Sequence, residues 1–183
     1  MDGPGLPAKR GAFIAVPLLA GAAVAVALGV FGRLHTPTGQ ALWKGPFPSV
    51  IAMKVWLTVV VLALALVQLF AALWMYGRLG VRPPQWIGRA HRAVGAVAVL
   101  VSIPVAANCL WVFGLQTYDG RVLAHGLLGC AFYGAFVAKV LTLHSRRVPG
   151  WALPVVAGLL FATVVAVSLT SAMWYLATHG RPS

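Results

Sequence analysis

Long apolar stretches alternate with short polar and basic connections along the whole chain. A helix rises 1.5 Å per residue, so about 20 apolar residues are enough to cross about 30 Å of hydrocarbon. The pattern predicts an all-α integral membrane bundle of five transmembrane helices, at about residues 12–31, 50–76, 90–116, 122–143 and 151–177. We expect residues 1–183 to form one transmembrane domain.

Proline, glycine and basic residues mark the connections between these stretches. The first connection, residues 33–49, contains three prolines, and the second, residues 77–89, contains a Pro-Pro pair. The third, Thr117–Gly120, is a short polar turn. Because so short a turn joins them, the third and fourth helices are expected to be antiparallel neighbours.

Composition supports a chain whose solvent is lipid. Hydrophobic residues make up 61% of the chain and charged residues only 9%, more apolar surface than a soluble domain of this size could bury. The net charge of +12 arises from 14 basic residues and 2 acids. Because the basic residues cluster between apolar stretches, they indicate topology in a lipid bilayer and not nucleic-acid binding.

The distribution of the basic residues predicts the orientation. They are more numerous on the side of the N-terminus, and cytoplasmic connections usually carry this excess. We therefore expect a bacterial plasma-membrane protein with its N-terminus in the cytoplasm and its C-terminus outside.

No predicted helix contains a carboxylate, since Asp2 and Asp119 are the only acids in the chain. Proton-coupled transporters usually carry a buried carboxylate, so this class is disfavoured, although an anion path lined by basic residues stays open. The chain has no paired carboxylates for hydrolysis and no Gly-rich phosphate loop. The sequence thus shows no hydrolase or transferase site, and an oxidoreductase subunit stays open.

Five histidines are the main candidates for chemistry. The predicted topology places His91 and His144 at the cytoplasmic end, and His35, His125 and His179 at the outer end. His91 and His125 begin antiparallel helices, so about 20 Å or more separates them and one iron cannot bind both. Each is followed four residues later by a glycine, which leaves room for a flat cofactor or for close helix packing.

One lysine and two cysteines are further candidates for binding or chemistry. Lys139 lies 14 residues after His125, at the predicted cytoplasmic end, where it either snorkels to the headgroups or holds an anion near His91. Cys109 and Cys130 lie at similar depth on adjacent helices. They are either small core residues or a thiol pair in the outer half of the membrane.

The segments around the two helix-opening histidines carry a resemblance. Residues 91–95 (HRAVG) and 125–130 (HGLLGC) look like a family of small bacterial multi-pass membrane proteins of unknown function. More distantly, the arrangement is similar to the transmembrane haem-b cytochromes that include ascorbate-dependent and ferric reductases. The resembling segments are residues 68–79, 86–107 and 121–139, with weaker likeness in 151–174.

The resemblance implies a membrane electron-transfer subunit that carries one or two haem b groups and passes electrons to a redox partner protein. The alternative is a non-enzymatic accessory or scaffold subunit of a membrane complex, whose histidines are structural. In the cytochrome interpretation the iron ligands would be His91 with His144 and His125 with His179 or His35, and the propionate partners would be Lys139, Arg89 and Arg92.

The predicted topology can be tested by labelling cysteines from outside the cell. Single cysteines placed at Arg82 and at His179, in a background without Cys109 and Cys130, should lie on opposite sides of the membrane. An impermeant maleimide should label position 179 in intact cells and position 82 only after permeabilisation. Labelling of both from the same side would contradict five crossings.

Overall fold

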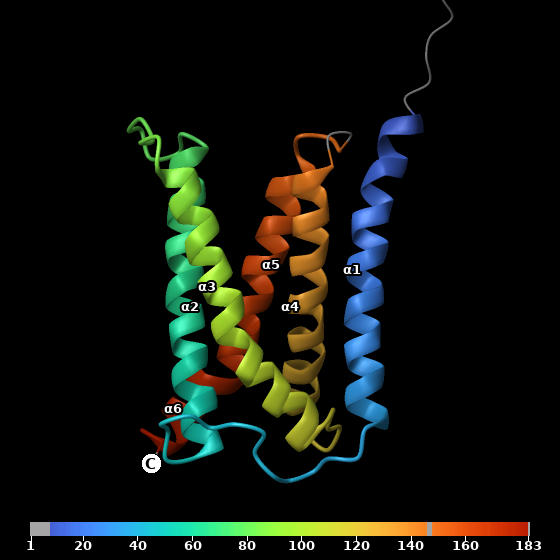
Figure 1. The fold of residues 1–183 in the computed structure, drawn as a ribbon, viewed down its shortest axis with the longest axis vertical. Coiled ribbons are helices and arrows are strands. Elements are labelled where there is room, and N and C mark those ends of the chain that lie inside the picture. The colour runs from blue at the N-terminus through green and yellow to red at the C-terminus, as the bar shows by residue number, and fades with distance from the viewer. Residues whose placement is uncertain (1–7, 146–147, 183) are drawn as a thin grey trace, which may run out of the picture.

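The computed structural model describes residues 8–145 and 148–182, with side chains from residue 14 onward. All of its regular elements in this part of the chain are helical (Figure 1). They are α1 (Ala8–Leu34), α2 (Val50–Met75), α3 (Ile87–Asn108), η1 (Cys109–Phe113), α4 (Gly120–His144), α5 (Ala152–Ser168), η2 (Leu169–Met173) and α6 (Trp174–His179), where η1 and η2 are π-helical.

The described residues contain five helices long and apolar enough to span a membrane, which confirms the predicted fold class. The third span runs through α3 into η1, and the fifth runs from α5 through η2 into α6. The chain is therefore a multi-pass membrane protein. We call the end where α1 begins the N-terminal face and the opposite end, where α6 finishes, the C-terminal face (Figure 1).

The third and fourth helices differ from the prediction at their ends. The helix α3 begins at Ile87, three residues earlier than predicted, because its N–H donates to the Pro84 carbonyl as the chain leaves the Pro-Pro pair. The span finishes at Phe113 because Gly114 adopts φ 68°, which ends the helical turn. The helix α4 begins at Gly120, where the Asp119 carboxylate accepts the Arg121 N–H at 2.7 Å.

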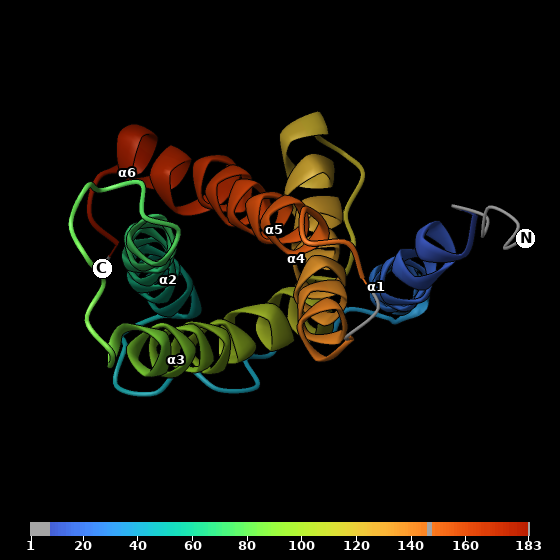
Figure 2. The same cartoon turned by 90° about the horizontal axis from the view of Figure 1, so that it is seen from above.

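Four helices form the body of the bundle, and α1 lies outside it. Seen from above, α2, α3, α4 and α5 surround a central region, while α1 packs along α4 (Figure 2). The main helix pairs are α1 with α4, α2 with α3, and α4 with α5. The fourth helix therefore bridges α1 and the body of the bundle.

The contact between α1 and α4 depends on two facing glycines. A Cβ atom at Gly134 would lie 2.5 Å from the Gly21 carbonyl oxygen, and one at Gly21 would collide with the Gly134 carbonyl oxygen. Both glycines are buried. Small residues allow helix backbones to approach closely in lipid, where dispersion and backbone contacts drive association. Because Gly21 and Gly134 have no side chain, α1 can pack closely against α4.

A leucine at Gly21 should separate α1 from α4. Because the added side chain meets backbone that cannot move aside, we expect destabilisation of about 1–3 kcal/mol, seen as a lower Tm in detergent. Gly29→Leu on the same helix is the matched control, because nothing lies within 4 Å of its added Cβ. Equal Tm values for the two variants would show that the glycine contact does not hold α1.

Candidate functional site

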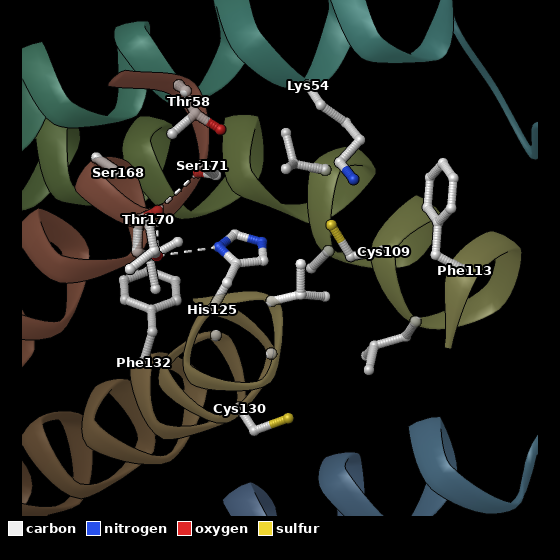
Figure 3. A pocket seen from close by; sticks show the side chains of 18 of the residues that line it. Lys54, Thr58, Cys109, Phe113, His125, Cys130, Phe132, Ser168, Thr170 and Ser171 are labelled. Carbon is white, nitrogen blue, oxygen red and sulfur yellow. Dashed lines mark hydrogen bonds between the residues drawn. The ribbon is translucent and has the colours of Figure 1, made fainter. Parts of the chain in front are cut away.

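A cavity of about 430 Å³ lies among the helices, nearer to the C-terminal face. Most of its wall is apolar, and this composition is typical of small-molecule and cofactor sites. A limited set of polar side chains enters it from several helices (Figure 3). These residues are Lys54, Thr58, Ser102, Cys109, Gln116, Tyr118, Arg121, His125, Cys130, Tyr133, Ser168, Thr170, Ser171 and Tyr175.

Both π-helical segments form part of the cavity wall. The segment η1 contributes Cys109 and Phe113, and η2 contributes Thr170 and Ser171. A π-helical turn is rare and is found frequently at functional sites, because it redirects side chains from the regular helical face. Here the two irregular segments carry polar and reactive groups into the cavity from the third and fifth spans.

The His125 imidazole is held by the hydroxyl group of Thr170. The Thr170 Oγ1 atom lies 2.8 Å from the Ala166 carbonyl, to which it donates its one proton, and 3.4 Å from His125 Nδ1. Because that proton is already used, Oγ1 can only accept from the ring, which assigns the hydrogen to Nδ1. The Nε2 nitrogen then keeps its lone pair, and it lies on the side of the ring that faces Lys54 and Cys109 (Figure 3).

The thiol of Cys109 and the ammonium group of Lys54 lie on the same side of the His125 imidazole (Figure 3). Lys54 Nζ also lies 4.3 Å from the centre of the Phe113 ring, a cation–π contact. In the described part of the chain, the only ion pair joins Arg121 to Asp119, at 3.8 Å. The charge of Lys54 is therefore not matched by a carboxylate, although it lies within a membrane span.

Arg121 contributes a second cation to the cavity wall. Its guanidinium group lies 3.5 Å from the centre of the Trp174 ring and donates to the Thr170 carbonyl at 2.8 Å. Arg121 also pairs with Asp119 across the start of α4. These contacts fix one positive charge near the C-terminal face and tie α4 to η2.

The side chain of Asn108 fastens the connection between α1 and α2 to α3. Its Oδ1 atom accepts the Leu42 N–H at 3.2 Å, and its Nδ2 donates to the Trp43 and Pro104 carbonyls at 3.0 and 2.9 Å. Asn108 is 1% exposed. A buried amide with three partners holds the residue just before Cys109 in a single position.

Comparison with known proteins places the chain in a family. A family of unknown function (DUF6529) matches residues 14–183. The chain belongs to this family. No curated protein and no solved structure matches it. Membership of the DUF6529 family agrees with the predicted resemblance to small membrane proteins of unknown function, and it carries no information on haem or electron transfer.

Three of the histidines in this DUF6529 protein lie outside the cavity. His35 stacks on Phe31 with ring centres 5.0 Å apart, and its Nε2 lies 3.2 Å from the Trp111 carbonyl. His179 is exposed and stacks on Tyr175 at 4.8 Å. His144 is exposed at the end of α4, and its Nδ1 lies 2.8 Å from the Val140 carbonyl of its own helix. Each of these three imidazole rings therefore already has a stacking or hydrogen-bond partner outside the cavity.

His91 lies near the other end of the bundle, in the first turns of α3. Its Nδ1 atom is buried and has no hydrogen-bond partner among the described residues, while its carbonyl accepts the Gln68 amide at 2.6 Å. Gln68 is the polar side chain that faces His91 and Gly95 from α2. The grouping of His91 with Lys139 and Arg92 around an anion stays a prediction.

The two cysteines have different surroundings. Both are free thiols, and Cys130 is buried on the side of α4 that faces α1, away from Cys109 (Figure 3). Both residues line the cavity, but Cys130 also lines the space between α4 and α1. The sequence did not indicate which way each side chain points.

Sequence reasoning missed the grouping of Lys54, Arg121 and Thr170 around His125. A lysine inside an apolar stretch was the available signal, since ionisable residues within a membrane commonly face a cavity or a pathway. The hydroxyl of Thr170 gave no such signal, because the α4–η2 contact that brings it to His125 depends on packing between distant segments.

Replacing Asn108 should loosen the connection between α1 and α2. In Asn108→Leu the Leu42 N–H and the Trp43 carbonyl lose their partner, which should cost about 1–3 kcal/mol and speed proteolysis of residues 35–49. Thr163→Val is the matched control, because that buried hydroxyl bonds only to the Leu160 carbonyl of its own helix. Equal proteolysis rates in both variants would contradict the assigned role.

Proposed function

We propose that this DUF6529 protein is an electron-transfer subunit of a bacterial plasma membrane, similar to haem-b cytochromes, with one haem b in the central cavity. His125 would be an iron ligand, and electrons would pass to or from a separate redox protein. The observation that carries the proposal is the His125 ring, whose Nε2 lone pair points into a cavity of about 430 Å³.

The donor set and the space around His125 fit a haem. Ligating histidines commonly donate their other ring N–H to a neighbouring oxygen, which is the arrangement of Nδ1 with Thr170. Nothing lies within 4 Å of a Cβ atom built on Gly129, one turn after His125 and also in the cavity wall. The helix surface beside the imidazole is therefore open enough for a flat macrocycle.

The surroundings of His91 favour only one haem. A Cβ atom on Gly95 would lie 3.3 Å from Gln68 Oε1, so the Gln68 side chain already occupies the helix face beside this glycine. Gln68 is also fixed there by its bond to the His91 carbonyl. The ligand pair His91 with His144 stays a prediction, and the proposal is limited to the cavity at His125.

The residues of the cavity would give the haem its electrical and solvent environment. Lys54 and Arg121 are the cations in the wall, and Arg121 would neutralise a propionate in the way predicted for Lys139 and Arg92 at the other face. Phe132, Tyr133 and the aliphatic wall would exclude water and thereby tune the potential. When bound, haem supplies reversible one-electron transfer at its iron, and the chain supplies position and electrostatics.

A non-enzymatic accessory subunit is the second candidate function. Aromatic stacking of His35 and His179 and the capping contact of His144 favour structural roles for three of the five histidines. The α1–α4 glycine contact also shows a chain suited to close helix association. In this alternative the cavity would hold lipid, and no redox cofactor would bind.

The haem proposal predicts a spectrum that depends on one histidine. Protein purified from haem-sufficient cells should show a reduced-minus-oxidised difference with a Soret shift and an α-band. His125→Ala should abolish it, because the only imidazole in the cavity wall is lost. His144→Ala is the matched control on the same helix, since that ring is exposed and bonds only to its own helix.

Two outcomes would contradict the proposal in different ways. A wild-type protein without haem bands would support the accessory subunit. Haem bands that survive in His125→Ala but change in His144→Ala would move the site to the N-terminal face, with His91 as the remaining ligand.

A further inference from the structure

We propose that Cys109 would hold the haem iron together with His125. The inference rests on the proposed function and names a residue that the resemblance to histidine-ligated cytochromes does not imply. A six-coordinate iron takes one ligand from each side of the macrocycle, and cysteine thiolate is one of the groups that proteins use. In this cavity the side opposite His125 presents a thiol.

The two side chains come from opposite walls of the cavity. His125 is on α4, within the fourth span, and Cys109 is the first residue of η1, within the third. The sulfur lies on the side of the imidazole that carries the free Nε2 atom (Figure 3). Each residue is also fixed from behind, since Asn108 anchors the residue before Cys109 and Thr170 holds the His125 ring.

Lys54 makes the position suitable for a thiolate. Its ammonium group lies against the Phe113 ring on the same side of His125 as the Cys109 sulfur (Figure 3), and the cavity wall contains no carboxylate. Thiolate is the form of cysteine that binds metals, and a neighbouring cation compensates its charge in a membrane interior. Ligation would release the thiol proton to water.

The other neutral or basic groups in the wall fit the role less well. Tyr133 OH is 2.9 Å from Ser102 Oγ, which donates in turn to the Val99 carbonyl, so the phenol is already engaged. The amine of Lys54 faces the same side of His125 as the sulfur and is therefore the main competitor (Figure 3). The test must therefore separate Cys109 from Lys54.

The axial ligand can be identified by electron paramagnetic resonance and absorbance of the ferric, haem-loaded full chain. We expect a low-spin thiolate signature in the wild type and its loss in Cys109→Ser. Cys130→Ser is the matched control and should keep the signature, because that residue also lines the cavity but its side chain lies away from the Nε2 side of His125 (Figure 3). Lys54→Met should shift the signature without abolishing it, since the sulfur would remain.

A second readout needs only the wild-type chain and covers the case in which Cys109→Ser does not fold. Protein from haem-deficient cells is alkylated with a small maleimide and analysed by mass spectrometry, with and without added haem. Added haem should protect Cys109, while Cys130 should react equally in both samples. An equal reaction of Cys109 with and without haem would overturn its assignment as a ligand.

The outcomes separate this inference from the proposed function. A haem spectrum that needs His125 but is unchanged in Cys109→Ser would leave the electron-transfer proposal standing and overturn the axial assignment. Loss of the signature in Lys54→Met, with Cys109→Ser unchanged, would assign the lysine amine as ligand instead. A wild type that binds no haem would overturn both proposals.

Discussion

Every polar group that this chain carries into the bilayer must find its partner within the chain, because hydrocarbon offers none. Most of the buried groups comply. Ser168 donates to the Val164 carbonyl one turn earlier, and Asn108 satisfies three backbone groups at the boundary between α3 and η1. Gln68 bridges α2 and α3 through the His91 carbonyl. This requirement decides where the connections attach to the helices and which polar side chains remain available to bind a ligand.

Several groups that could bind a ligand gather in the cavity, while the unpartnered Nδ1 atom of His91 lies near the N-terminal face. Lys54 has no carboxylate partner in the described chain, and the Nε2 side of His125 faces both Lys54 and the Cys109 thiol (Figure 3). Uncompensated charge is costly in a membrane, so a cluster of such groups beside a cavity favours a bound ligand over a purely structural role. The proposed haem would match them, with an iron for the imidazole and the sulfur and a propionate for Arg121.

The fold was largely predictable from sequence, because lipid imposes a simple rule on apolar length. The five spans follow from hydropathy, and the short Thr117–Gly120 turn predicts that the third and fourth helices are antiparallel. Helix ends were less accurate, because Gly114 and the Pro83–Pro84 pair act through local backbone geometry. The close Gly21–Gly134 contact was not predicted, since many Ala and Gly residues in the first span could have faced a neighbour.

The site was predictable only in part. His125 and its glycine were identified, but the opposite wall depends on how α2, η1 and η2 approach α4, which no single segment encodes. The central claim is that one haem binds per chain in that cavity, and pyridine haemochrome quantification against protein concentration tests it most directly. The account predicts a ratio of one haem to one chain in wild-type protein from haem-sufficient cells. A ratio of zero, or of two, would contradict it.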